Sequence, residues 1–360
     1  MKVVFRVDAS SEIGTGHIMR CLTLAQLLSE SGVEIVFISR RHKSNLNHIV
    51  TEKCYELYEL PCYEIDDENA ATNSYLNWLG TTWEQDARQV NGILTGFKPK
   101  PDLLIVDHYS LDHKWETKVR PNCKQLMVID DLANRKHNCN FLLDQTVGRT
   151  ESDYQTLVSA NTSLLLGTNY ALLRPEFMYW RDYSIQRREV PVLKNILITF
   201  GGVDADNYTS MVIQALNQCS IKGTIAVTVI LGEHAPHINI VRDAVNTVSF
   251  ETTILTNVTN MAEVMAKSDL CIGAAGATSW ERCCLALPSF MIVIANNQEN
   301  IAESVSRKRS AILLKLPWKE NLLNEIEKLD ALQMKELSHN SSNLVDGMGA
   351  ERVVERIIRL

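Results

Sequence analysis

Near the start of the chain, a histidine follows a short glycine loop, a combination that could perform acid–base chemistry. The segment RVDASSEIGTGHIMRCLTLAQLL (6–28) contains an apolar strand pattern, then Gly14, Thr15 and Gly16, then His17 at the predicted start of a helix. Glycine lets the backbone approach a ligand closely, and a helix start offers free N–H groups and a positive dipole to an anion. The same dipole disfavours an imidazolium, so it favours a neutral histidine that can act as a general base.

Two known types of nucleotide-binding loop do not match this segment. The third glycine of a dinucleotide fingerprint would stand where the chain has Met19, and no GK[ST] sequence follows the loop. His17 therefore has two interpretations: a solvated residue at a helix start, or a base aimed at a ligand bound over the loop. Ligands of parallel sheets bind where such loops lie, but these residues alone leave both interpretations open.

A second strand–turn–helix segment, CIGAAGATSWERCCLALPSFMIVIANNQEN (271–300), could bind a nucleotide. Its small-residue turn, which includes Gly276, leaves room for a bulky anion, and a helix is predicted to start near Thr278. Glu281 lies about one turn into that helix, where a carboxylate can accept hydrogen bonds from a ribose diol. Alternatively, Glu281 only complements the helix dipole. The next predicted strand is followed by an amide-rich loop with Asn296, Asn297, Gln298 and Asn300.

A glycine pair follows another predicted strand, in the sequence ITFGGVDADN. Gly201 and Gly202 permit close backbone approach there. The Asp-Ala-Asp motif matches the metal-binding D-x-D of some sugar-nucleotide enzymes, but Asp204 or Asp206 is placed to cap the helix predicted to begin near Tyr208. Capping requires no metal, so we predict no metal site at this motif.

Polar side chains end two predicted strands of the first half. Asp8 ends the first strand, and the sequence VDHYSLDHKWE ends another with Asp107, His108 and Tyr109. Ligands bind at the carboxyl ends of parallel strands, so we expect Asp8, His108 and Tyr109 to contribute to a sugar pocket. The alternative is that these side chains only stabilise their loops.

The composition is that of an ordinary globular protein. The chain has 360 residues, of which 45% are hydrophobic, and this length predicts two domains. The formal charge of -7, with both signs interspersed, argues against a nucleic-acid partner, which would require a basic stripe. No coiled coil and no plainly apolar surface helix is evident, so we expect a monomer.

Nine cysteines are scattered along the chain without a CxxC pair, and Cys21, Cys271, Cys283 and Cys284 lie in apolar or helix-like runs. We therefore predict buried reduced thiols, typical of a cytoplasmic protein, in preference to disulfides or a zinc site. The opening MKVVFRVDAS is predicted to be a strand and not a signal peptide. The longest apolar stretch, LPSFMIVIA, is far shorter than the ~20 residues of a membrane span, so we expect a soluble protein with no membrane partner.

Short apolar strands alternate with helical patterns in both halves, which predicts parallel sheets covered on both faces. The alternation breaks at 174–192, a charged and aromatic stretch flanked by Pro175 and Pro191. We predict an α/β protein with two doubly wound, Rossmann-like domains: 1–173 with the histidine loop, and 193–360 with the nucleotide site. Residues 174–192 are predicted to connect them, and the last helix could pack back on the first domain. Two such domains predict a ligand cleft between them.

Together these segments resemble the PseG family of UDP-sugar hydrolases. The resemblance runs from residue 1 to about 305, and residues 42–100 and 310–360 add little to it. It rests on the blocks RVDASSEIGTGHIMRCLTLA, VDHYSLDHKWE, IDDLANRKH, GTNYALLRPEF, FGGVDADN and GAAGATSWERCCLALPSFMIVIANNQEN. The last block is also similar to the nucleotide site of MurG-type N-acetylglucosaminyltransferases, and both families have the GT-B fold. MurG-type enzymes carry Gly-Gly-His in the first loop, whereas one glycine precedes His17 here, which favours the hydrolase.

The resemblance implies hydrolysis of UDP-2,4-diacetamido-2,4,6-trideoxy-β-L-altropyranose to UDP and the free sugar, a step of pseudaminic acid biosynthesis. It implies His17 as the catalytic base that activates water, and we expect inversion at the anomeric carbon without a metal or another cofactor. The altro configuration comes from the resemblance alone, and the family's tyrosine near the sugar has no assured match around Trp78. With the glycine loops included, the predicted UDP-sugar contacts are Gly14, Thr15, Gly16, Gly201, Gly202, Gly276, Ala277, Thr278, Ser279, Glu281, Asn297, Gln298 and Asn300.

The main alternative is a GT-B glycosyltransferase with a UDP-sugar donor, in which an acceptor hydroxyl replaces water. A transferase with a lipid acceptor would be expected to carry an apolar or basic membrane-facing patch, for which SRRHKSNLNH (39–48) is a modest candidate. A hydrolysing 2-epimerase would require acids and bases on both sugar faces, and these blocks do not resemble that family. A nucleotide-sugar-binding protein without catalysis would have no need of His17.

Overall fold

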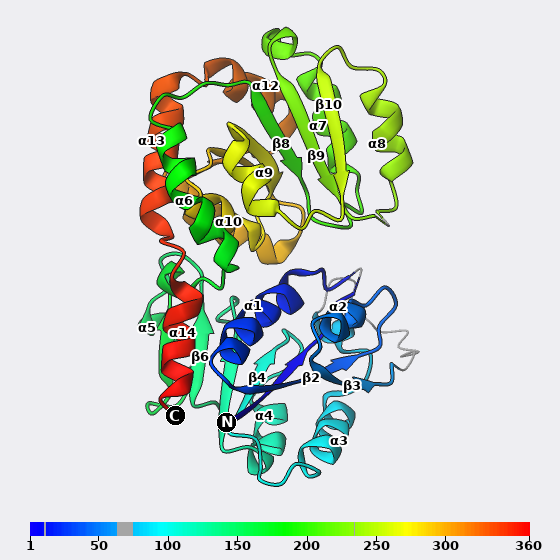
Figure 1. The fold of residues 1–360 in the computed structure, drawn as a ribbon, viewed down its shortest axis with the longest axis vertical. Helices are drawn as coiled ribbons and strands as arrows, with labels where there is room; N and C mark the ends of the chain where they lie inside the picture. The colour runs from blue at the N-terminus through cyan, green and yellow to red at the C-terminus, as the bar shows by residue number, and fades with distance from the viewer. Residues whose placement is uncertain (11, 63–74, 234) are drawn as a thin grey trace. The chain divides into compact units, whose positions relative to one another are not determined.

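Parallel β-sheets form the centres of two separate units in the computed structural model, which describes residues 1–10, 12–62, 75–233 and 235–360 (Figure 1). The first unit contains residues 1–172 and 349–360, and the second contains residues 173–348. In both units helices connect most of the successive parallel strands, and a loop without a helix joins the fifth strand of the chain to the sixth. The predicted α/β fold class, with two doubly wound Rossmann-like sheets, is therefore confirmed.

The sheet of the first unit has the strand order β3-β2-β1-β4-β5-β6-β7, and every neighbouring pair is parallel. Its strands are β1 (Lys2–Val7), β2 (Glu34–Arg40), β3 (Glu56–Leu60), β4 (Leu103–Asp107), β5 (Gln125–Ile129), β6 (Phe141–Asp144) and β7 (Ser163–Leu166). The helices are α1 (Gly16–Glu30), α2 (Asn47–Glu52), α3 (Trp83–Leu94), α4 (His113–Val119), α5 (Glu151–Tyr154) and α14 (Gly349–Ile358). The strand order reverses direction between β1 and β4, and ligands of doubly wound sheets bind at such a switch point.

Strand β1 shows why this sheet is covered on both faces. Val3 and Phe5 point to one face, where they join an apolar core that includes side chains of α1 and α14. Val4 points to the other face and packs in a separate core with side chains of α3 and α4. Side chains of a strand alternate between the two faces, so a strand that is apolar throughout requires helices on both.

The sheet of the second unit has the order β10-β9-β8-β11-β12-β13 and is also parallel. Its strands are β8 (Asn195–Thr199), β9 (Ala226–Leu231), β10 (Glu251–Thr256), β11 (Leu270–Ala274), β12 (Ser289–Ile292) and β13 (Ile312–Leu313). The helices are α6 (Pro175–Arg187), α7 (Tyr208–Leu216), α8 (Ile238–Val245), α9 (Met261–Lys267), α10 (Thr278–Cys284), α11 (Glu299–Arg307), α12 (Trp318–Lys328) and α13 (Ala331–Leu344). Here the switch point lies between β8 and β11, which places the two glycine turns that follow these strands at one edge of the sheet.

Two segments near the predicted domain boundaries fold into helices. The stretch 174–192, which we predicted as a connector, contains α6 and lies in the second unit. Pro175 stands at the first turn of α6, where proline is favoured, and the helix is too polar to show an apolar period in the sequence. At the end of the chain, α14 packs in the core of the first unit through Val353 and Ile357. A side chain at Gly349 would place its Cβ atom 2.4 Å from the backbone of Ala171, so only glycine allows this approach.

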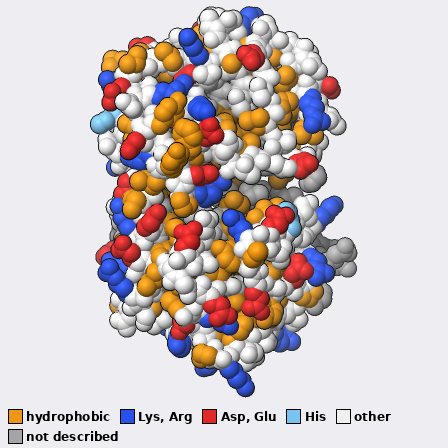
Figure 2. All heavy atoms as spheres, in the orientation of Figure 1, with side chains coloured by type: hydrophobic (Ala, Val, Ile, Leu, Met, Phe, Trp, Pro, Cys, Tyr) orange, Lys and Arg blue, Asp and Glu red, His pale blue; other side chains and the backbone are white. Residues whose placement is uncertain are grey.

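The cysteine prediction can be compared with the structure directly. All nine thiols are free, and the four that we predicted to be buried, Cys21, Cys271, Cys283 and Cys284, are buried. Lys and Arg side chains alternate with Asp and Glu over the face drawn in Figure 2, as the interspersed charges of the sequence predict. Among the described residues, none of the helices combines the length and the apolar character that a membrane span requires.

Candidate active site

A buried histidine–aspartate pair lies at the switch point of the first sheet. The last residue of β4, Asp107, pairs in register with Val7 of β1, the strand that leads through the glycine loop into α1. His17 is the second residue of α1, and its Nδ1 atom lies 2.6 Å from Oδ1 of Asp107. His17 is 7% exposed and Asp107 is 1% exposed. The solvated helix-start interpretation of His17 is therefore wrong.

Arg20 fixes the charge of this aspartate. One helical turn after His17, Arg20 donates from Nε to Oδ2 of Asp107 at 2.6 Å and from an Nη atom to Oδ1 at 2.7 Å. Burial alone would raise the pKa of the Asp107 carboxyl, but Arg20 and His17 hold that pKa well below its usual range. The carboxylate is therefore ionised and can only accept hydrogen bonds.

The ionised carboxylate determines the tautomer of the histidine. A contact of 2.6 Å between Nδ1 and an acceptor-only oxygen places a proton on Nδ1. The other ring nitrogen, Nε2, is then the basic one in the neutral imidazole. Helix α1 and Asp107 therefore leave Nε2 as the ring nitrogen of His17 that can accept a proton.

An aromatic cluster lies against this histidine. The ring of Tyr109 meets the ring of His17 edge-on, with 4.6 Å between the centroids, and the Trp78 ring lies 6.2 Å from His17. Tyr75 contacts both Trp78 and Tyr109, at 4.9 and 5.4 Å between ring centroids. The Tyr109 hydroxyl donates to Asp131 at 3.0 Å, and Asp131 also pairs with Arg20. Tyr109 therefore packs against His17, and its contribution to a sugar pocket stays a prediction.

Asp8 and His108 have a different environment from Tyr109. Asp8 is completely buried, and it accepts hydrogen bonds from Arg6 at 2.5 and 2.9 Å and from the backbone N–H of Arg40 at 2.6 Å. His108 is buried as well, its Nε2 lies 3.2 Å from Asp8, and burial lowers the pKa of its imidazole. These two side chains therefore pair with each other and hold the interior of the first unit together. This agrees with the alternative interpretation, in which they only stabilise their loops.

The glycine loop before α1 is closed by its own hydrogen bonds. The N–H of Gly14 donates to the carbonyl of Ser10 at 2.9 Å, and the Ser10 hydroxyl accepts from the N–H of Ile13 at 3.0 Å. Gly14 has a φ of +80°, which requires glycine, although a Cβ atom would meet nothing within 4 Å. The side chain of Thr15 does not cap α1, so it provides no hydrogen-bond acceptor for the first N–H groups of this helix.

In the second unit, the predicted nucleotide turn joins β11 to α10. Gly276, Ala277 and Thr278 are partly exposed. A Cβ atom built on Gly276 would lie 3.9 Å from the side-chain amide nitrogen of Gln298, so this amide lies beside the turn. The Gln298 carbonyl oxygen accepts from the N–H of Ile294 at 3.1 Å, which fixes its direction. Asn297 is partly exposed and Asn300 is exposed in the same segment.

Ser279 differs from its neighbours because its side chain points inward. Only 1% of Ser279 is exposed, and its hydroxyl accepts from Arg282 at 2.9 Å. Arg282 also donates to the carbonyl of Ala274 at 2.8 Å, so the pair ties α10 to the end of β11. The Ser279 side chain therefore stabilises the turn from inside.

Glu281 forms an ion pair within the second unit. Its carboxylate lies 3.4 Å from Arg174, which also pairs with Glu176 at 3.0 Å. The Glu281 side chain retains 17% of its exposure, and burial raises the pKa of its carboxyl although Arg174 opposes this. Arg174 therefore pairs with the carboxylates of both Glu281 and Glu176.

The glycine pair of the second unit precedes a capped helix. Gly201 is exposed with a φ of +86°, and Gly202 is partly exposed. Asp204 is buried and accepts from the N–H groups of Tyr208 at 2.9 Å and Thr209 at 3.0 Å. Asp204 thus bonds to the first turn of this helix, in the way predicted for the Asp-Ala-Asp motif, but the N-cap residue is Asn207, whose side chain accepts from the N–H of Ser210 at 3.4 Å. No cluster of His, Cys, Asp or Glu suited to a metal is present in residues 1–10, 12–62, 75–233 and 235–360.

Three charged groups of the site were missed by the sequence analysis or placed differently. Asp107 was noted at its strand end, but His108 and Tyr109 were selected in its place. Arg20 and Asp131 were not considered for the site. The available signal was the position of Asp107 as the last residue of a strand next to β1, but its partner His17 is 90 positions away in the sequence.

Comparison with known proteins identifies the fold. Residues 195–357 match the model of the Glycosyltransferase family 28 C-terminal domain. The chain is similar to the crystal structure of Acinetobacter baumannii MurG, with a TM-score of 0.68 and 14% identity over 100% of this chain and 99% of that chain. At this identity the likeness shows the fold alone, and that fold is GT-B.

Relatives found by sequence indicate a narrower group of proteins than the structural neighbours do. The chain is 28% identical over 223 residues to the UDP-2,4-diacetamido-2,4,6-trideoxy-beta-L-altropyranose hydrolase of Campylobacter jejuni subsp. jejuni, covering 61% of this chain and 68% of that protein. It is 27% identical over 341 residues to an uncharacterized protein of Methanocaldococcus jannaschii, which is 92% of this chain but only 63% of that relative's length. The predicted resemblance to PseG is confirmed.

Proposed function

We propose that this protein hydrolyses UDP-2,4-diacetamido-2,4,6-trideoxy-β-L-altropyranose to UDP and the free sugar, as part of pseudaminic acid biosynthesis. The similarity to the Campylobacter hydrolase supports the substrate class, a UDP-sugar. The observation that carries the proposal is the hydrogen bond between His17 and Asp107. A hydrolase needs a base to activate water, and this pair supplies one in a defined tautomer.

In the proposed reaction, the oxygen of a water molecule bonds to the anomeric carbon as the bond from that carbon to the phosphate oxygen breaks. UDP leaves with the electron pair of the broken bond, and Nε2 of His17 takes the proton of the water. Asp107 stays ionised and stabilises the imidazolium that forms, because Arg20 neutralises it on both oxygens. Attack opposite the leaving group inverts the anomeric carbon and needs no covalent intermediate.

The second unit is proposed to bind UDP. Gly276, Ala277 and Thr278 offer backbone N–H groups at the start of α10, and Gln298 lies beside them. Such N–H groups can hold the negative charge that develops on the leaving diphosphate without a metal ion. Glu281, one turn into α10, is proposed to accept hydrogen bonds from the ribose hydroxyls.

Replacing Glu281 with Ala is expected to weaken UDP binding about 10- to 100-fold, the effect of losing a charged hydrogen bond, and to change the rate of the chemical step much less. Isothermal titration with UDP measures the affinity, and single-turnover kinetics measure the step. Glu176→Ala is the matched control, because it also removes a carboxylate from Arg174 but lies outside α10. If both variants bind UDP as the wild type does, Glu281 serves only its ion pair with Arg174 and the dipole of α10.

A metal-free reaction at carbon predicts two further results. Activity should survive EDTA, and hydrolysis in ¹⁸O-labelled water should place the label on the sugar, with the new sugar initially in the inverted anomeric form. Mass spectrometry of the products would locate the label, and NMR spectra recorded early in the reaction would show the anomeric form of the sugar. Label on UDP, or activity lost with EDTA and restored by magnesium, would indicate attack at phosphorus with metal assistance and contradict the proposal.

A glycosyltransferase that uses a UDP-sugar donor is the second candidate. The match of residues 195–357 to the Glycosyltransferase family 28 C-terminal domain and the similarity to MurG favour it. Incubation with the UDP-sugar in the absence of any acceptor separates the two candidates. A hydrolase releases UDP at full rate, whereas a transferase releases UDP rapidly only after an acceptor is added.

A further inference from the structure

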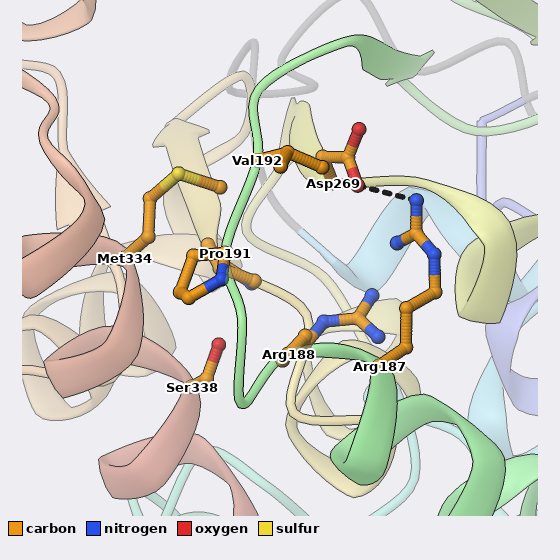
Figure 3. Close-up of a pocket in the computed structure, with 8 residues that line it drawn as sticks. Arg187, Arg188, Pro191, Val192, Asp269, Met334 and Ser338 are labelled. Carbon is orange, nitrogen blue, oxygen red and sulfur yellow. Dashed lines mark hydrogen bonds and ion pairs between the residues drawn. The ribbon is translucent and has the colours of Figure 1, made fainter.

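A small recess in the second unit lies apart from the residues discussed above. It has a volume of about 200 Å³, including its opening to solvent, and Arg188, Pro191, Met334 and Ser338 are among the residues that line it. Figure 3 shows Arg188 entering from the end of α6 and Ser338 from α13 on the other side. The space in which the centre of a water-sized molecule can lie is only about 10 Å³, so this recess admits one water molecule or one small ion.

Arg188 is a buried cation without a carboxylate partner among the residues that the structure describes. Only 6% of it is exposed. Its two Nη atoms donate to backbone carbonyls, which include those of Ser184 at 2.8 Å and Ser268 at 2.8 Å. Its Nε atom is buried and has no hydrogen-bond partner. Buried charges are normally paired, and buried N–H groups are normally bonded, so the Arg188 charge lacks a carboxylate partner and its Nε–H group lacks an acceptor, although both Nη atoms are hydrogen-bonded.

Ser338 brings a second unpartnered group to the same recess. It is 6% exposed, and its hydroxyl has no hydrogen-bond partner. Serine in a helix commonly bonds to a carbonyl of the preceding turn, which this hydroxyl does not do in α13. The recess thus holds two buried donors, the Nε–H of Arg188 and the O–H of Ser338.

The charges around the recess do not balance. Asp269 also lines it, but its carboxylate is already held by Arg187 at 2.5 Å and by the N–H groups of Lys194 at 3.0 Å and Asn195 at 2.7 Å. Arg187 and Arg188 together therefore exceed Asp269 by one positive charge. Burial and the charge of Arg187 together lower the pKa of the Arg188 guanidinium to about 9, although Asp269 acts in the opposite direction.

We propose that this recess binds one small monovalent inorganic anion of chloride size, held by Nε–H of Arg188 and the hydroxyl of Ser338. An anion accepts from both donors and cancels the excess positive charge, whereas a water molecule satisfies only the hydrogen bonds. The apolar side chains of Pro191 and Met334 complete the wall and favour a weakly hydrated ion. The proposal is independent of the activity proposed for His17.

Crystals of the full chain grown in sodium bromide test the site directly, because bromide scatters anomalously. We expect an anomalous peak within hydrogen-bond distance of Nε of Arg188 and of Oγ of Ser338. Electron density without an anomalous peak would mean that water fills the recess, and the proposal would then be wrong.

Thermal unfolding in solution shows whether the ion stabilises the fold. At equal ionic strength, we expect sodium chloride to raise the unfolding midpoint about 2–4 °C above sodium gluconate, whose anion is too large for the recess. Ser338→Ala should raise the chloride concentration for half of this effect about 5- to 10-fold, while Ser342→Ala, one turn along α13, should leave it unchanged. A bromide peak without chloride-specific stabilisation would indicate an ion bound only at crystal concentration and would also overturn the proposal.

Arg188→Lys provides a second variant that keeps the positive charge but removes the Nε–H group. We expect the chloride effect on the unfolding midpoint to disappear in a folded Arg188→Lys protein. An unchanged chloride effect would contradict the role given to this side chain. If this variant does not fold, the comparison of Ser338→Ala with Ser342→Ala decides the question alone.

Discussion

Replacing His17 with Asn is expected to lower kcat on the UDP-sugar by about 10²–10⁴-fold, the usual contribution of a general base, and to change substrate affinity by no more than a few-fold. The imidazole would take its proton only as water attacks, so it contributes mainly to the transition state. Release of UDP under single-turnover conditions measures the rate, and titration with the UDP-sugar measures the affinity.

His48→Asn is the matched control for this experiment. His48 is exposed on α2 of the same unit, so the same substitution there should leave turnover unchanged. If His17→Asn retains turnover within a few-fold of the wild type, the imidazole is not the base. His17 would then serve only to hold Asp107 and Arg20 in place.

Replacing Asp107 with Asn is expected to lower kcat by at least about 10²-fold, although this side chain does not touch the reacting atoms in the proposed mechanism. Asp107 positions His17 and stabilises the imidazolium that forms during the reaction. An amide nitrogen in its place can donate to Nδ1, which would put the proton on Nε2 and remove the base. The loss should appear in kcat more than in KM.

Measurements on the folded protein separate this positioning role from a purely structural one. Circular dichroism measures the folded fraction of Asp107→Asn, and kcat per folded molecule should still fall by at least about 10²-fold. Asp102→Asn is the matched control, because Asp102 immediately precedes the other end of β4 and bonds to Lys2 and Lys124. If Asp107→Asn loses activity only because less protein folds, the remaining folded fraction would show the wild-type kcat.

The lowered pKa values of two buried aspartates predict how acid affects the stability of the first unit. The pKa of the Asp107 carboxyl is well below its unfolded value, so its ion pair contributes stability that is complete above the ordinary pKa of an aspartate. That stability is lost as the pH falls toward the folded pKa. Asp130 has a lowered pKa as well, since Arg135 opposes the effect of its burial, and it acts in the same direction. Loss of the site at low pH therefore follows from protonation of buried, paired aspartates.

The sequence by itself determined the fold class and several local features. Apolar strands separated by helical patterns require parallel sheets with two covered faces, and both sheets have this form. The Asp-Ala-Asp motif was correctly linked to the start of α7, because Asp204 bonds to N–H groups only four and five positions away, although the N-cap residue is Asn207. The position of His17 at a helix start was also local, since the glycine loop and the helix that follows it are adjacent in the chain.

Only the tertiary structure decided which charged groups act together. Asp107 reaches His17, and Asp131 reaches Arg20 across 111 positions, because β1, β4 and β5 are neighbours in the sheet. The sequence could not distinguish Asp8, which is paired with Arg6, from Tyr109, which packs against His17, since both stand at or just beyond a strand end. Successive residues there point in different directions, and the register and burial of the strands, which the sequence does not state, determine which neighbour each side chain meets.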